Sequence, residues 1–241
     1  MRKPEVSRPL RFPVNNQILM SLPRDEYHGL LTGLTPVRLP QGKVLWEVEE
    51  RITRLYFPTS GMISLVSTTE SGSVVEVGMI GNEGVAGLSG LLGCSAAPYR
   101  VVVQLPGVAM RIGLDAIQRE FARGGRLQGL LLRYTHVLLM QISQSAACNR
   151  FHTAEQRLCR WLLTSRDRAG SDVFHLTQEF LAQMIGTPRS NVAMIAGGLK
   201  GKRLITIGRG RVEILDPRGL EKHSCECYKI VSDSLKGFAA A

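Results

Sequence analysis

Hydrophobic and polar positions alternate in short runs over the first half of the chain. Between residues 36 and 112, segments rich in β-branched and aromatic side chains are separated by turns that contain glycine or proline. Many short strands at this spacing are typical of a small antiparallel barrel, jelly roll or sandwich. We expect strands at residues 44–47, 53–57, 62–69, 73–80, 101–105 and 108–112.

A helical pattern begins after Gly124 and Gly125. Apolar or small side chains then recur at steps of three and four residues, which places them on one face of an amphipathic helix. Such a stripe fits either the core of one subunit or a seam between two identical helices, and we favour the seam. The stripe consists of Leu127, Leu131, Tyr134, Leu138, Ile142 and Ser145.

The last third of the chain is expected to be helical and then to form a hairpin. Residues 152–167 have a helical pattern, and two short helices follow within residues 176–199. Two strand-like segments, 205–207 and 212–215, are joined by a glycine-containing turn. A last helix or a loose tail follows, and the final ten residues are expected to be frayed.

The two short helices carry helix-turn-helix residue types at the expected spacing. With Gln178 as the first position, the small Ala182 falls where the helices cross, and Gly186 falls where the turn needs a positive φ. Val192 and Ile195 lie three residues apart on the second helix and can pack back onto the first. An ordinary αα-hairpin in another fold is the alternative interpretation.

Both short helices have candidate caps. Thr177 can accept a backbone N–H at the start of the first helix. Thr187 can cap the second helix, with Pro188 at its first position, where the missing N–H costs nothing. Gly197 and Gly198 together would cost about 2 kcal/mol of helix propensity, so the second helix is expected to end there.

The charge of the chain favours a polyanionic partner. The chain has 30 basic and 20 acidic residues, which gives a formal net charge of +10. Half of this excess lies within residues 176–211, where Glu179 is the only acid beside six basic residues. The six are Arg189, Lys200, Lys202, Arg203, Arg209 and Arg211.

The second short helix would enter a major groove with its N-terminal residues at the base edges. Arg189 can pair in a bidentate way with guanine, and Asn191 can address adenine, with Ser190 and Met194 beside them. Arg189 could instead contact a phosphate, and residues 200–203 could form a solvated turn. Contacts to the DNA backbone are assigned to Thr177, Thr187, Lys200, Lys202, Arg203, Arg209 and Arg211.

Several other classes of protein are disfavoured. No segment reaches the roughly 18 apolar residues of a membrane helix, and no apolar signal-peptide core is present, so we expect no membrane partner. The five cysteines lack a disulfide-framework spacing, which fits the reducing cytoplasm. No HExxH, Walker A, GxSxG or paired-carboxylate pattern is found, so we do not expect an enzyme.

The segment His-Ser-Cys-Glu-Cys at residues 223–227 could hold a soft metal or act as a thiol switch. It lacks the usual CxxC spacing and a second ligand pair, so no metal site is expected. A redox role for Cys225 or Cys227 stays open. Cys148 and Cys159 lie on helix faces, where small core residues are common.

The order of these parts resembles the Crp/Fnr family of bacterial transcription regulators. The resemblance covers residues 20–215 and is most specific in LTQEFLAQMIGTPRSNV, residues 176–192, where Arg189 matches the family's base-reading arginine. It implies an α+β fold with an N-terminal antiparallel, jelly-roll-like β-roll, a long dimerisation helix and a C-terminal winged helix-turn-helix. It also implies a homodimer on two-fold symmetric double-stranded DNA, with RNA polymerase as a further partner. The implied parts are an N-terminal arm (1–22), a β-roll effector domain (23–122), a dimerisation helix (123–151), a DNA-binding domain (152–231) and a tail (232–241).

The glycine-rich segment of the β-roll departs from the cyclic-nucleotide-binding members of the family. Leu88 stands where those members have a glutamate, and Ala97 and Pro98 stand at their Arg-Ser pair. Glu83 and Arg100 are nearby but out of register. Because an apolar leucine cannot bind ribose hydroxyls, we expect no ordinary binding of cyclic AMP.

Two further departures concern the cofactor and the DNA target. Iron–sulfur members have an N-terminal cysteine cluster, whereas no cysteine precedes Cys94 here, so no cofactor is expected and the effector is not assigned. Ser190 and Met194 replace an acid and an arginine of the family, so the target site should differ. A cyclic-nucleotide-responsive regulator with a non-standard pocket is one alternative. A cupin-like barrel enzyme is another, although residues 36–112 contain no histidine for its metal.

Overall fold

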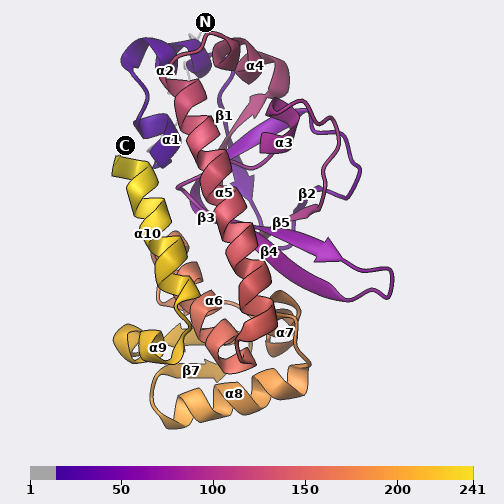
Figure 1. The fold of residues 1–241 in the computed structure, drawn as a ribbon, viewed down its shortest axis with the longest axis vertical. Helices are drawn as coiled ribbons and strands as arrows, with labels where there is room; N and C mark the ends of the chain where they lie inside the picture. The colour runs from indigo at the N-terminus through magenta and orange to yellow at the C-terminus, as the bar shows by residue number, and fades with distance from the viewer. Residues whose placement is uncertain (1–14, 241) are drawn as a thin grey trace, which may run out of the picture.

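The computed structural model describes residues 15–240 as two packed halves along one long helix (Figure 1). The first half is an antiparallel sheet with the strand order β1-β5-β3-β4, and β2 also pairs with β5. The sheet is the expected β-roll and not a closed barrel. Its elements are α1 (Gln17–Met20), α2 (Arg24–Leu31), β1 (Thr35–Leu39), β2 (Val44–Trp46), β3 (Arg54–Thr68), β4 (Val74–Ile80), α3 (Leu88–Leu91), β5 (Arg100–Gly113) and α4 (Leu114–Ala122).

Four of the expected strands merge into two long ones. The segments 53–57 and 62–69 are both part of β3, and the segments 101–105 and 108–112 are both part of β5. The proline- and glycine-containing stretches between them do not form turns, because they lie opposite each other where the β3–β5 register shifts. Irregular pairing at this point absorbs those residues within two continuous strands.

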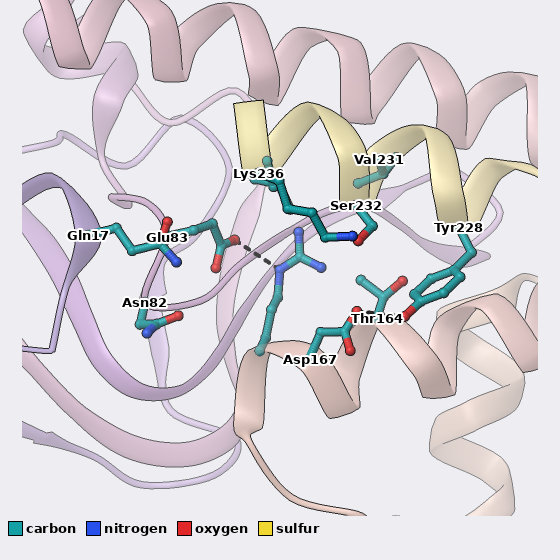
Figure 2. A pocket seen from close by; sticks show the side chains of 11 residues that line it. Gln17, Asn82, Glu83, Thr164, Asp167, Tyr228, Val231, Ser232 and Lys236 are labelled. Carbon is teal, nitrogen blue, oxygen red and sulfur yellow. Dashed lines mark hydrogen bonds and ion pairs between the residues drawn. The ribbon is translucent and has the colours of Figure 1, made fainter. Parts of the chain in front are cut away.

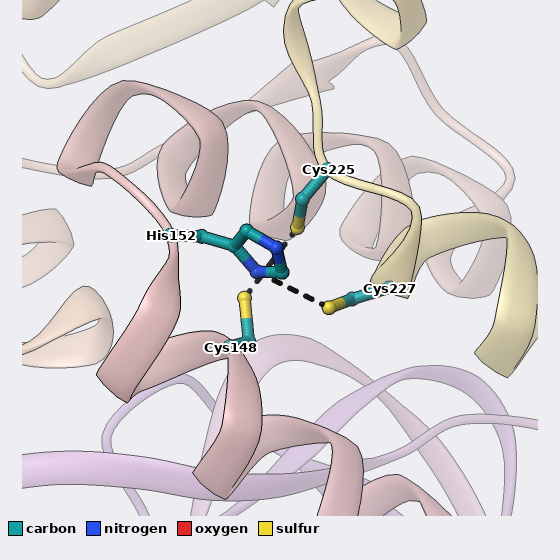
Figure 3. Close-up of side chains that lie close together, drawn as sticks. All are labelled: Cys148, His152, Cys225 and Cys227. Carbon is teal, nitrogen blue, oxygen red and sulfur yellow. Dashed lines mark hydrogen bonds between the residues drawn. The ribbon is translucent and has the colours of Figure 1, made fainter.

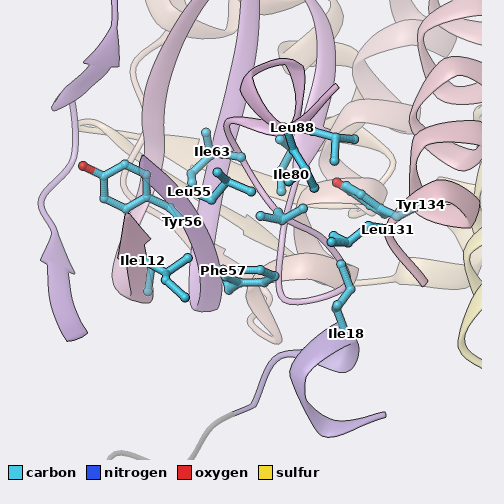
Figure 4. Close-up of a cluster of buried hydrophobic side chains, with 14 of the residues drawn as sticks. Ile18, Leu55, Tyr56, Phe57, Ile63, Ile80, Leu88, Ile112, Leu131 and Tyr134 are labelled. Atoms are coloured by element: carbon cyan, nitrogen blue, oxygen red, sulfur yellow. The ribbon is translucent and has the colours of Figure 1, made fainter. Parts of the chain in front are cut away.

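Helix α5 (Arg126–Phe151) runs beside both halves of the molecule (Figure 1). The stripe expected to form a dimer seam faces the core of its own subunit instead, as Leu131 and Tyr134 show in Figure 4. That seam is therefore corrected, because side chains already buried within their own subunit cannot also cover a second subunit. The buried stripe comprises Leu127, Leu131, Tyr134, Leu138 and Ser145, with Ile142 partly buried.

The C-terminal segment is a packed helix and not the frayed tail expected from the sequence. Helix α10 (Cys227–Ala240) lies along α5 (Figure 1). Val231, Leu235 and Phe238 recur at steps of four and three residues, which is the spacing of one helix face. Phe238 is 5% exposed, and its ring centroid lies 5.9 Å from that of Tyr134. Burial of this apolar face is the physical reason for the helix.

The second half has its own core, which also contacts the sheet of the first. Trp161 is its largest fully buried side chain, and Met62, Met79 and Leu105 of the β-roll belong to the same apolar cluster. A small antiparallel sheet has the order β6-β8-β7. The elements are α6 (Ala154–Ala169), β6 (Val173–Phe174), α7 (Gln178–Ile185), α8 (Arg189–Gly201), β7 (Ile205–Gly208), β8 (Arg211–Ile214) and α9 (Pro217–His223).

None of the helices within residues 15–240 combines the length and the apolar content needed to cross a membrane.

Candidate nucleic-acid interface

Helices α7 and α8 form the helix-turn-helix that the residue spacing predicts. Thr177 Oγ1 accepts the backbone N–H of Phe180 at 3.1 Å and so caps α7. Gly186 ends α7 with a φ of 60°, in the left-handed region that favours glycine. Ala182 and Val192 are both buried, as expected for residues between the crossing helices. The short-range rules of capping and turn chemistry therefore place the start of α7 and the turn after it correctly.

The start of α8 differs from the expectation. Its N-cap residue is Pro188, and α8 begins at Arg189. Thr187 makes no side-chain cap to α8, and its hydroxyl oxygen instead accepts a hydrogen bond from Asn191 Nδ2 at 3.2 Å. This contact holds the Asn191 amide against the turn.

The end of α8 also differs from the expectation. The helix continues through Gly197 and Gly198 to Gly201. Ala196 and Leu199 on its inner face are at most 1% exposed. Their burial offsets the low helix propensity of the glycines, which sequence propensity alone does not include.

The four residues assigned to base reading lie on the solvent side of α8. Arg189, Ser190 and Asn191 are exposed at its N-terminal end, and Met194 is 69% exposed one turn later. The same side continues with small residues that the sequence analysis did not single out. A Cβ atom added at Gly197 or Gly198 would meet nothing within 4 Å. This side of the helix is therefore exposed, and at the two glycines it carries no side chain.

Strands β7 and β8 form the expected wing beside α8. Its tip is Arg209–Gly210, and both residues have a positive φ, of 49° and 74°. Two consecutive left-handed residues are typical of the tight turn that matches the twist of a hairpin. The Arg209 side chain is therefore presented at the tight turn that ends the hairpin.

The basic side chains assigned to DNA phosphates are all exposed, but two of them also have acidic neighbours. Lys202 Nζ lies 3.5 Å from Glu155 Oε1, and an Arg211 guanidinium nitrogen lies 3.0 Å from Glu213 Oε2. Exposed pairs of this kind are weak, so DNA phosphates can compete for both cations. The other exposed basic side chains are Lys200, Arg203 and Arg209.

The residues aligned with the nucleotide cassette do not come together as a site. Leu88 is 6% exposed and Ala97 is 1% exposed, both within the apolar core, while Pro98 is exposed. Arg100 pairs with Glu47 at 3.2 Å, and Glu83 turns toward α6. Of the aligned positions, Leu88 and Ala97 have thus become part of the core.

Two models of known families match the two halves of the chain separately. The cyclic nucleotide-binding domain matches residues 36–123, which contain most of the β-roll. The Crp-like helix-turn-helix domain matches residues 156–223, which contain α7, α8 and the wing.

The chain belongs to the Crp/Fnr family of transcription regulators. It is a DNA-binding regulator and not an enzyme, which sets aside the cupin-like alternative.

Known proteins with the same organisation are distant in sequence. The global nitrogen regulator of Synechococcus elongatus is 22% identical over 209 residues, which cover 81% of this chain and 94% of that protein. A Crp/Fnr-family transcriptional regulator from Eubacterium rectale shares 14% identity with a TM-score of 0.67, covering 88% of this chain and 97% of that one. The c-di-GMP-responsive regulator CLP of Xanthomonas campestris shares 15% identity with a TM-score of 0.65, covering 79% and 98%.

In this Crp/Fnr protein, a tyrosine fills the space between α5 and the glycine-rich loop after β4. A Cβ atom at Gly84 would lie 2.0 Å from the Tyr134 hydroxyl oxygen, so only glycine allows the loop to lie over the ring. Burial is the main cause that raises the pKa of Tyr134 well above its usual value. The neutral ring is therefore part of the packing.

Buried polar side chains also connect the β-roll to the DNA-binding half of the regulator. Arg168 of α6 binds Glu83 at 2.9 Å and also donates to the side-chain oxygen of Gln141 on α5. Gln141 Nε2 donates to the carbonyl oxygen of Met79 at 2.9 Å. A cavity of about 330 Å³ lies beside this ion pair, with Lys236 of α10 on its wall (Figure 2). These contacts were not predicted, because their partners are far apart in sequence.

A second buried acid connects the sheet to α6. Glu76 of β4 accepts a hydrogen bond from Trp161 Nε1 at 3.0 Å and another from the Ser64 hydroxyl. Burial raises the pKa of Glu76 to about 7, although both hydrogen bonds oppose the shift. This carboxyl group can therefore change charge near neutral pH inside the contact between the two halves.

The segment 223–227 is divided between two neighbours. His223 Nδ1 lies 3.0 Å from Glu155 Oε1 and so turns toward α6. Cys225 and Cys227 are buried against the end of α5. The three side chains considered together in the sequence analysis therefore do not form one site by themselves.

Proposed function

We propose that this chain acts in the cytoplasm as a homodimeric transcription regulator that reads an inverted-repeat DNA operator. The observation that carries the proposal is the side of α8 that presents Arg189, Ser190, Asn191 and Met194 together to solvent. A recognition helix with exposed N-terminal donors can read base edges in a major groove. Lys200, Arg203 and the wing arginines would bind the phosphates on either side.

A second subunit would pack against the outer face of α5. Leu132, His136, Leu139 and Ser143 are exposed and follow steps of four, three and four residues. This is the spacing of a two-helix seam, and Leu139 is 62% exposed in the single subunit. A two-fold axis through this seam would present two α8 helices to half-sites about one helical turn apart.

Cyclic AMP would not be the signal. The positions that should bind its ribose and phosphate are occupied by buried Leu88 and Ala97, and Tyr134 fills the adjacent space. Calorimetry with cyclic AMP and cyclic GMP should therefore give no saturable heat. Micromolar binding of either nucleotide would contradict this part of the proposal. We also include RNA polymerase as a partner, as the family resemblance implies.

The DNA proposal is tested by selecting random duplex DNA with the purified protein near physiological salt. The wild type should enrich an inverted repeat. Arg189→Ala should lose preference at one position of each half-site, because a bidentate arginine–guanine pair contributes about 1–3 kcal/mol of discrimination. Arg119→Ala is the matched control, because Arg119 is an exposed arginine on α4, at the far end of the molecule from α8 (Figure 1). Salt-sensitive binding without an enriched sequence would contradict the proposal.

A further inference from the structure

Four metal-binding side chains meet where α5 ends and α10 begins (Figure 3). One ligand atom from each of Cys148, His152, Cys225 and Cys227 lies within 4.8 Å of all the others. The Sγ atoms of Cys148 and Cys225 are 3.5 Å apart, and Cys227 Sγ lies 3.4 Å from His152 Nδ1. All three cysteines are at most 3% exposed.

We infer that these four residues form a structural zinc site of the Cys₃His type, with Glu226 positioning the histidine. Zinc–sulfur and zinc–nitrogen bonds of about 2.3 and 2.0 Å place tetrahedral ligand atoms about 3.5–3.8 Å apart. The Cys148–Cys225 and Cys227–His152 separations, at 3.5 and 3.4 Å, are already near this value. Four protein ligands complete the tetrahedron and leave no open position, as in structural rather than catalytic sites.

The surroundings of the histidine support a metal ligand. His152 Nε2 lies 3.2 Å from Glu226 Oε1, so its other nitrogen, Nδ1, is the one directed at Cys227. A carboxylate on the far nitrogen of a ligating histidine fixes the ring and makes it a better ligand. A disulfide would need neither this histidine nor its carboxylate.

The surroundings of the cysteines also suit thiolates. Gln144 Nε2 donates to Cys227 Sγ at 3.0 Å. Three thiolates around a doubly charged zinc ion carry a net charge of −1. The buried cation Arg160 interacts electrostatically with Cys148. A ligand set of three sulfurs and one imidazole suits zinc better than magnesium or calcium.

The site was missed in the sequence because its two ligand pairs are far apart. Cys148 and His152 sit one helical turn apart at the end of α5, whereas Cys225 follows 77 residues after Cys148. The proposal therefore revises the expectation that the chain has no metal site. A metal here would fasten α10 to the junction of α5 and α6, directly beside the residues that begin the DNA-binding half.

The first experiment measures the metal content of the full-length protein, purified under reducing conditions without a metal-binding tag. The wild type should contain about one zinc ion per subunit. Cys94→Ser should keep it, because Cys94 is exposed and outside the cluster. Cys148→Ser should lose it. Protein without zinc, a Cys148–Cys225 disulfide, or an iron–sulfur chromophore in place of zinc would overturn the proposal.

A second experiment does not depend on the folding of a cysteine variant. Metal-free wild-type protein titrated with Co²⁺ should develop the absorption of a tetrahedral cobalt–thiolate centre, and its absence would overturn the proposal. Glu226→Gln should weaken zinc binding about 10–100-fold in a chelator competition. Glu226 is 68% exposed, so this change should leave the fold intact. Glu221→Gln, at an exposed position of α9, is the control. Equal zinc affinity of the wild type, Glu226→Gln and Glu221→Gln would overturn the role of Glu226.

Discussion

Arg168 Nε binds Glu83 Oε1 at 2.9 Å, and the two side chains are only 3% and 5% exposed. Arg168 belongs to the first helix of the DNA-binding half, and Glu83 follows the last residues of β4 in the β-roll. The pair is therefore a buried charge contact between the two halves of a regulator. Its position suits a contact that holds the β-roll and the DNA-binding half in a fixed arrangement.

Removing one charge of this pair should destabilise the protein strongly. Arg168→Met leaves the Glu83 carboxylate buried without its cation, which costs about 3–5 kcal/mol of unfolding free energy. Urea unfolding measures the loss. The control is Arg123→Ala, because the Arg123 side chain is 69% exposed in its 3.1 Å pair with Glu120 and should contribute less than about 1 kcal/mol. Adding Glu83→Gln to Arg168→Met should restore part of the loss, and purely additive losses would contradict a direct coupling.

The helix-turn-helix could be predicted from sequence because its determinants are local. Thr177 contacts a backbone amide three residues away, and Gly186 acts on its own φ angle. The assignment of Arg189 to an exposed helix start depended on nothing outside this segment. Where the prediction failed, at Gly197 and Gly198, the deciding factor was burial of the opposite helix face against the rest of the domain.

Long-range packing explains what the sequence could not show. An amphipathic stripe such as that of Tyr134 has the same spacing whether it faces a β-roll or a second subunit, so periodicity alone could not choose between them. The partner that decides is Gly84, which lies 50 positions earlier and leaves room for the ring. Likewise, Cys148 is an ordinary buried thiol until the fold places Cys225 beside it.

Glu76 should make the stability of the protein depend on pH. Its pKa is about 7 in the folded protein and 4.5 as an ordinary carboxyl, so the folded state holds the proton more tightly. The associated stability is fully present below pH 4.5 and is lost as the pH rises through 7. A shift of this size corresponds to roughly 3 kcal/mol. The loss should be complete near pH 8.

Glu76→Gln removes this titration and keeps a side chain that can still contact Trp161. Unfolding free energies at pH 5 and pH 8 should therefore differ less in Glu76→Gln than in the wild type. Glu70→Gln, at an exposed position of the β3–β4 hairpin, should retain the wild-type dependence. An identical pH dependence in wild type and Glu76→Gln would show that the carboxyl is already ionised at pH 5.

The proposed seam predicts that a charge at Leu139 separates the subunits. Leu139→Glu puts a carboxylate on a position that is 62% exposed in the single subunit, so the subunit should still fold. Analytical ultracentrifugation should show a monomer, with weaker binding to an operator of two half-sites. Met20→Glu is the control, because Met20 is equally exposed, at 65%, but lies on α1. A monomeric wild type, or a dimeric Leu139→Glu, would contradict the seam.

The two glycines of α8 predict a conflict between stability and DNA binding. Gly197→Ala should raise the unfolding free energy by about 1 kcal/mol, because alanine favours the helix and the added methyl group meets no protein atom. The same methyl group would stand on the solvent side of α8, which approaches the DNA in the proposed complex, so affinity for the operator should fall. Thermal unfolding measures the change in stability, and titration with operator DNA measures the change in affinity. If Gly197→Ala binds DNA as tightly as the wild type does, this side of α8 does not lie against the groove.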